Sequence, residues 1–158
     1  MGIRRLSGLV PGFSASAPVH QMQVGLDATD YSAGVSLSAG TWTAPLWSKV
    51  DRDSGGWWDG TAYDWTPTHT GLYVIHAQAK HNADEYGGWR LYDETGAAYI
   101  IRMFRQGGDD SRSTFATWQF WLEGGNAYSV QLYTSSASLY YADSYTMVSG
   151  PYVTDGGS

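Results

Sequence analysis

The chain has 158 residues, a length typical of one domain with its own hydrophobic core. It carries nine Lys and Arg against fifteen Asp and Glu, a formal net charge of −6, which excludes the basic surface that nucleic acids and anionic membranes require. There is no cysteine for disulfides or thiolate metal sites, and no apolar run approaches the ~20 residues of a membrane-spanning helix.

Aromatic residues and glycine dominate the composition, with eight Trp, twelve Tyr and twenty Gly. Aromatic side chains favour strands and glycine favours turns, so the composition predicts an all-β fold. Residues 1–19, rich in Gly, Ser, Pro and Ala, show no periodicity and are interpreted as an extended N-terminal arm. From His20 onward, short β-like runs alternate with turns, as in a sandwich or barrel.

In chain order, the predicted strands span residues 20–26, 34–37, 44–50, 63–65, 72–80, 88–92, 98–104, 114–122, 127–134 and 139–148. Residues 51–56 are predicted as a turn, because they combine Asp, Ser and Gly. The domain is expected to span residues 20–153 and to be followed by a short tail over 154–158.

Two of these strands carry large apolar side chains on both faces. They are Leu72, Tyr73, Val74 and Ile75 in the first, and Phe115, Trp118, Phe120 and Trp121 in the second. A lone sandwich leaves one face of each sheet in water, so a second apolar face indicates a second covering layer. Self-association is the simplest cover, and single exposed aromatics of no special role are the alternative.

Six positions resemble the signature of the complement component 1q globular head, at the spacing of that family: Trp47, Asp53, Trp58, Trp65, Gly71 and Tyr73. Ile75 and Ala77 depart from it, because they stand where the family usually has aromatic residues. The runs at 122–130 and 149–153 are similar to the family's glycine turn and closing strand.

The resemblance implies a ten-stranded antiparallel jelly-roll sandwich of the complement-1q and tumour-necrosis-factor type. Such domains form homotrimers whose inner sheets surround a threefold axis. On that basis Tyr73, Ile75, Trp118 and Phe120 are expected at the trimer interface. Gly71 is expected to allow a tight turn into the central strand.

A calcium loop is one interpretation of Asp51, Asp53 and Asp59, which place carboxylates at alternating positions near glycines. The bidentate Glu of the helical calcium loop is replaced by Ala62, so a plain Asx turn is the favoured alternative and no metal is predicted. A sugar-stacking platform is a separate hypothesis for Trp57, Tyr86 and Trp89.

No catalytic motif is present: the sequence has no nucleophile elbow, zinc-helix motif or phosphate-binding glycine loop. His76 and His81 are an odd number of residues apart and would point to opposite faces of one strand. The chain is therefore predicted to be non-enzymatic and to use no cofactor.

Small jelly rolls of this family that are rich in Gly, Trp and Tyr and lack Cys look like structural proteins of tailed phages, so the resemblance implies a phage virion protein. Because the sequence has no collagen repeat and no heptad stalk, a capsid decoration protein whose arm docks onto capsid or tail proteins is the expected form. A receptor-binding or minor tail protein at the tail tip is one alternative. A secreted, extracellular lectin-like or cytokine-like module is another. A host-surface glycan is a candidate partner, whereas nucleic acid and membrane are not.

Overall fold

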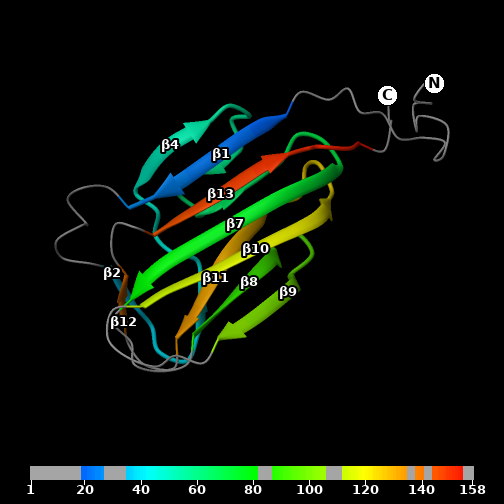
Figure 1. The fold of residues 1–158 in the computed structure, drawn as a ribbon. Coiled ribbons are helices and arrows are strands. Elements are labelled where there is room, and N and C mark those ends of the chain that lie inside the picture. Colours follow the sequence, from blue (N-terminus) through cyan, green and yellow to red (C-terminus); the bar gives the residue numbers. More distant parts are fainter. Residues whose placement is uncertain are drawn as a thin grey trace, which may run out of the picture.

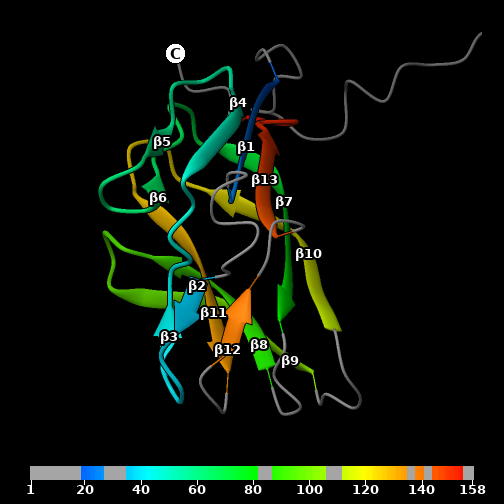
Figure 2. The same ribbon diagram turned by 90° about the vertical axis from the view of Figure 1, so that its left-hand side faces the viewer.

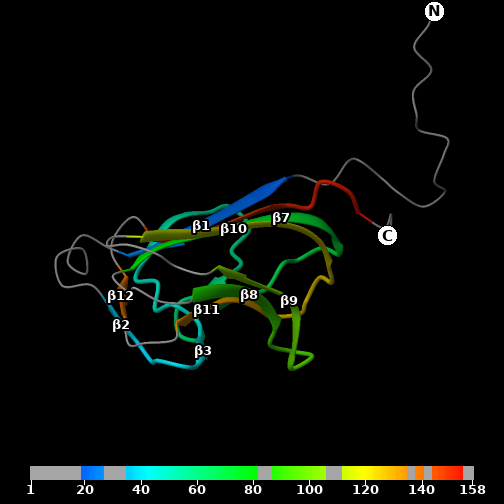
Figure 3. The same cartoon turned by 60° about the horizontal axis from the view of Figure 1, so that its bottom comes forward.

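The computed structural model describes residues 19–26, 35–81, 87–105, 112–134, 138–140 and 144–154. Regular structure in these ranges consists of β-strands alone, and nothing there is a helix long and apolar enough to cross a membrane. All strand pairs between named strands are antiparallel, and the strands form two sheets stacked face to face (Figures 1 and 3). The predicted all-β sandwich is confirmed.

The first sheet is centred on β7, which lies between β10 and β13; β1 and β4 continue the sheet beyond β13. A short pair, β12 and β2, extends it at the end of β7. The bounds of these strands are β1 (His20–Gly25), β2 (Val35–Leu37), β4 (Lys49–Asp53), β7 (Gly71–His81), β10 (Arg112–Leu122), β12 (Ser138–Tyr140) and β13 (Tyr145–Gly150).

The second sheet is built on three neighbouring strands, β11, β8 and β9. The free edge of β11 pairs with two very short strands, β3 and β6, and β6 in turn pairs with β5; Figure 2 shows β5 and β6 near β4 and β3 nearer the opposite end. The bounds are β3 (Trp42–Thr43), β5 (Trp58–Asp59), β6 (Asp64–Trp65), β8 (Gly87–Asp93), β9 (Ala98–Arg105) and β11 (Tyr128–Thr134).

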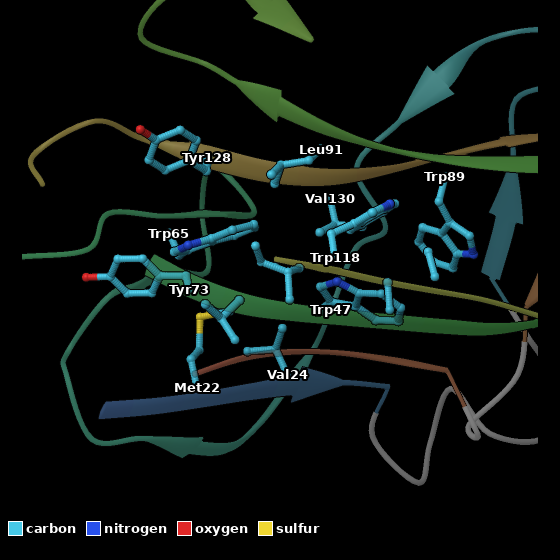
Figure 4. Packing of buried hydrophobic residues seen from close by; sticks show 14 of the residues in the cluster. Met22, Val24, Trp47, Trp65, Tyr73, Trp89, Leu91, Trp118, Tyr128 and Val130 are labelled. Carbon is cyan, nitrogen blue, oxygen red and sulfur yellow. The ribbon is translucent and has the colours of Figure 1, made fainter. Parts of the chain in front are cut away.

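The core lies between the sheets and is dominated by aromatic rings (Figure 4). Alternate residues of β7 are buried, starting from Gly71, and the register with β10 places Trp118 opposite Ile75 on the same inner side. The second sheet contributes Trp89 and Leu91 from β8. Each aromatic ring removes a large apolar area from water, so this cluster is the main source of stability.

Several predicted strand bounds needed correction. Residues 44–48 are not strand, and the predicted turn at 51–56 instead begins with the last residues of β4. The predicted strand over 139–148 is interrupted, with β12 and β13 on either side. The predicted arm and tail lie outside the described residues, except for Val19 and Thr154, and Thr154 forms an isolated bridge to Gly71.

Candidate functional site

The outer face of the first sheet is formed by alternate residues of β7, β10 and β13. The register places Thr117 and Met147 on either side of His76, and directly opposed residues of antiparallel strands point to the same side. We call the outward residues of these strands the β10 face: Leu72, Val74, His76, Gln78, Phe115, Thr117, Gln119, Trp121, Tyr145 and Met147.

The β10 face exposes large apolar side chains. Phe115 is 57% exposed, Trp121 41% and Met147 37%, although all three belong to regular strands of the sheet. Leu72 and Val74, on the neighbouring strand, are half-buried on the same side. Thr117 and Gln119 lie between Phe115 and Trp121 on β10, so the face alternates exposed apolar and polar side chains. Exposed large apolar side chains gathered on one face are typical of a contact site.

His76 lies at the middle of the β10 face. Its Nδ1 is 2.7 Å from the Thr117 hydroxyl, and its ring packs against that of Tyr145 with the centroids 5.5 Å apart. Burial lowers the pKa of His76 from its ordinary value, so the neutral imidazole is favoured. A neutral ring with a local hydrogen-bond partner is compatible with a contact surface that also carries apolar side chains.

The residues predicted for the trimer interface require correction. Tyr73 and Ile75 are completely buried, Trp118 is 6% exposed, and Phe120 packs against the same core. The Tyr73 hydroxyl donates a hydrogen bond to the carbonyl of His69 at 2.6 Å, and burial raises the pKa of this phenol to about 12. Figure 4 shows Tyr73 and Trp118 in the interior between the sheets. Any contact with another protomer therefore falls to the outward neighbours of these four residues.

The predicted sugar platform is also corrected. Trp57 is 3% exposed and Trp89 is 2% exposed, so neither ring is available to a ligand. The Trp57 ring packs edge-on against Tyr73, with centroids 5.7 Å apart, whereas Trp58 is only half-buried. Tyr86 lies outside the described residues.

The aspartates near β4 and β5 organise backbone turns. The Asp53 carboxylate accepts hydrogen bonds from the amides of Trp57 and Trp58, both at 2.9 Å, and Asp59 accepts from Thr61 and Ala62. These amide hydrogen bonds lower the pKa of Asp59.

Asp51 pairs instead with Lys49 at 2.5 Å. No group of three or more His, Asp and Glu side chains suited to a metal occurs among the residues that the structure describes. The carboxylate contacts therefore favour the Asx-turn interpretation over the calcium loop.

Comparison with known proteins gives similarity of fold. No protein-family model and no curated protein matches the chain. Among solved structures, Eiger TNF from S. frugiperda superposes with a TM-score of 0.64 at 15% identity, covering 84% of this chain and 92% of that one. Murine APRIL gives a TM-score of 0.62 at 14% identity, with 84% and 98% covered.

The globular domain of zebrafish complement 1qA protein gives a TM-score of 0.57 at 10% identity, with 84% and 94% covered. The fold is the complement-1q and tumour-necrosis-factor jelly roll. Sequence reasoning noted the doubly apolar strands but chose the wrong side of them. The motif positions Gly71 and Tyr73 are two residues apart, so they lie on the same side of β7, and both are buried. Had that side been taken as the inner one, Leu72 and Val74 would have been placed outside.

Proposed function

We propose that this chain is a non-enzymatic homotrimeric structural or binding module whose protomers contact one another through the β10 face. The observation that carries the proposal is the exposure of Phe115, Trp121 and Met147 on one side of a regular sheet. The jelly-roll fold supports it, because domains with this fold are typically trimeric binding modules rather than enzymes.

The size of the face is consistent with such a contact. β7 and β10 have eleven residues each, and at about 3.4 Å per residue each strand extends over roughly 35 Å. A stable interface removes about 800 Å² of surface from each partner. On a face of this length, Phe115, Trp121 and Met147 provide the apolar part of such a contact, around the polar pair of His76 and Thr117.

The trimer is tested with a charge placed on the β10 face. We expect the wild-type chain to be trimeric at micromolar concentration by light scattering, and Phe115→Lys to be monomeric and folded, because burying an unpaired ammonium is strongly unfavourable. Tyr99→Lys is the matched control, since Tyr99 is 51% exposed on the other sheet, and this variant should stay trimeric. A wild-type monomer would refute the proposal.

The place where such a trimer acts stays a prediction from the sequence. A virion surface, with residues 1–19 docked on capsid or tail proteins, is what the resemblance to small Gly-, Trp- and Tyr-rich phage jelly rolls without cysteine implies. Quantitative mass spectrometry of the copy number per phage particle would decide between these locations. Hundreds of copies indicate capsid decoration, a few copies in a multiple of three indicate a tail tip, and absence from particles favours an extracellular module.

A further inference from the structure

The outer face of the second sheet carries a cluster of rings and guanidinium groups that the proposed trimer contact leaves unused. Arg90 of β8 lies opposite Gln131 of β11 on one side and opposite Arg102 of β9 on the other. Two residues further along β8, Tyr92 lies opposite Tyr99. We call this set the guanidinium face: Trp42, Arg90, Tyr92, Tyr99, Arg102 and Gln131.

Arg90 is held in a fixed position by its neighbours. Its guanidinium carbon lies 5.0 Å from the centroid of the Trp42 ring and 4.6 Å from that of Tyr92. Its Nε donates a hydrogen bond to Gln131 Oε1 at 2.7 Å. Since a guanidinium stacked on aromatic rings keeps its planar fork of donors in one orientation, Arg90 is prepared for a planar anionic group.

Gln131 is a positioning residue beneath this arrangement. It is only 8% exposed, and its Nε2 donates to Glu94 Oε1 at 3.1 Å and to the Ser129 hydroxyl at 3.1 Å. The Ser129 hydroxyl also donates to Glu94 Oε1, at 2.5 Å. Both the Oε1 and the Nε2 of Gln131 are therefore hydrogen-bonded, which fixes the position of the Oε1 that accepts from Arg90.

Two like charges are placed side by side on this face, although the chain is acidic overall. Arg90 and Arg102 are directly opposed on neighbouring strands, and Arg102 in turn lies over the Tyr99 ring, 5.0 Å from its centroid. Directly opposed like charges repel, and Glu94 is one negative group that acts on Arg90. Burial and the neighbouring Arg102 charge both lower the pKa of Arg90, while Glu94 opposes that effect.

From this geometry we infer that the guanidinium face binds a sugar bearing a carboxylate, such as a hexuronic acid. The carboxylate would lie between Arg90 and Arg102, where a guanidinium fork matches its two oxygens. The apolar face of the sugar ring would pack on the Tyr99 ring, which is 51% exposed. A polyanion is disfavoured, because the chain has a net charge of −6 and offers only two cations here.

The site is independent of the proposed trimer. The guanidinium face and the β10 face are the outer faces of the two different sheets, so contact through one leaves the other open (Figure 3). The ligand site would therefore be present in a monomer as well as in a trimer.

The test compares two probes that differ by one carboxylate, methyl glucuronide and methyl glucoside, titrated at millimolar concentration into the full chain and followed by amide chemical shifts. We expect saturable binding of the glucuronide, with Arg90→Gln binding it about tenfold to hundredfold more weakly. Arg52→Gln is the matched control: it removes the same charge from an exposed residue of β4 and should bind as the wild type does.

Three results would overturn the inference: no saturable shifts with the glucuronide, equal binding of the glucoside, or equal loss in Arg90→Gln and Arg52→Gln. Thermal melting of each variant is the control that separates a loss of sugar binding from a loss of folding. Light scattering on the same samples reports the oligomeric state separately, so failure of the trimer and failure of the sugar site are distinguishable.

Discussion

Gly71 illustrates how one residue can be recognised from sequence for the wrong physical reason. The motif spacing identified the position, and a tight turn seemed to explain it. In the structure, the C-terminal segment that contains Pro151 and Val153 passes close to the backbone of Gly71. A Cβ on Gly71 would lie 2.3 Å from the carbonyl oxygen of Val153 and 2.6 Å from Pro151. The glycine is needed because another part of the chain passes too closely for any side chain.

Replacing Gly71 by alanine should therefore destabilise the fold. The added methyl group must push the Val153 backbone away, and that carbonyl accepts a hydrogen bond from the Leu72 amide at 2.8 Å. We expect a loss of about 1–3 kcal/mol in the free energy of unfolding, measured by denaturant melts. Gly60→Ala is the control, because its Cβ would meet only the Trp58 ring, at 3.4 Å, and should change little. Equal effects in the two variants would contradict this account.

The Trp57 and Trp58 pair shows what residue patterns leave undetermined. Trp58 is the motif position and Trp57 was predicted to be open to a ligand, yet Trp57 is buried, whereas Trp58 is half-buried against the core. The reason is local: one Asp53 carboxylate binds both amides and sets the direction in which the chain enters β5. A single backbone turn decides which of two adjacent side chains points inward, and spacing alone does not specify it.

At the scale of elements, the long strands and the short strands β2 and β6 were predicted from the sequence, whereas the two-residue strands β3 and β5 were not. β7, β8, β10 and β11 have continuous apolar or alternating patterns, and their predicted ranges match within one or two residues. The two-residue strands β3, β5 and β6 have no such pattern, and of these only β6 falls within a predicted strand, at 63–65. They form because a neighbouring edge strand offers hydrogen bonds, which is a tertiary effect.

The loop between β4 and β5 gives a prediction at this scale. Asp53→Ala removes the acceptor of two half-buried amides and should cost about 1–3 kcal/mol of stability. Asp51→Ala removes a surface ion pair with Lys49 and should cost less than about 1 kcal/mol. Thermal melts of the wild type with calcium and with a chelator should coincide. A calcium-dependent increase in melting temperature that Asp53→Ala abolishes would restore the metal interpretation.

At the scale of the whole molecule, the fold class followed from the sequence, whereas the candidate sites did not. Turn spacing and the resemblance at Trp47 to Tyr73 were enough for the jelly roll. The guanidinium face joins Trp42, Arg90 and Arg102 through strand pairings with β11 and β9. Such pairings depend on sheet order, which a pattern along the chain does not encode. Which side of β10 faces outward also depends on such a pairing, namely its register with β7.

The assembled molecule should be sensitive to acid through His76. Burial lowers the pKa of this imidazole below 6.5, and contact between protomers would remove more water from it. The groups that face the ring from neighbouring strands are Thr117, Tyr145 and Met147, and none of them carries a charge at neutral pH. The contribution of neutral His76 is therefore fully present above pH 6.5 and is lost as the pH falls below it.

We accordingly expect sedimentation to show a trimer at about pH 7.5 that weakens by about pH 5.5, because three imidazolium groups would have to share an apolar contact. His76→Gln keeps a hydrogen-bonding partner for Thr117 without the titration, and its assembly should be independent of pH in this range. His69→Gln alters an exposed histidine outside the face and should retain the acid sensitivity. If His76→Gln still dissociates in acid as the wild type does, the proton acts elsewhere and the β10 face is not the contact that it controls.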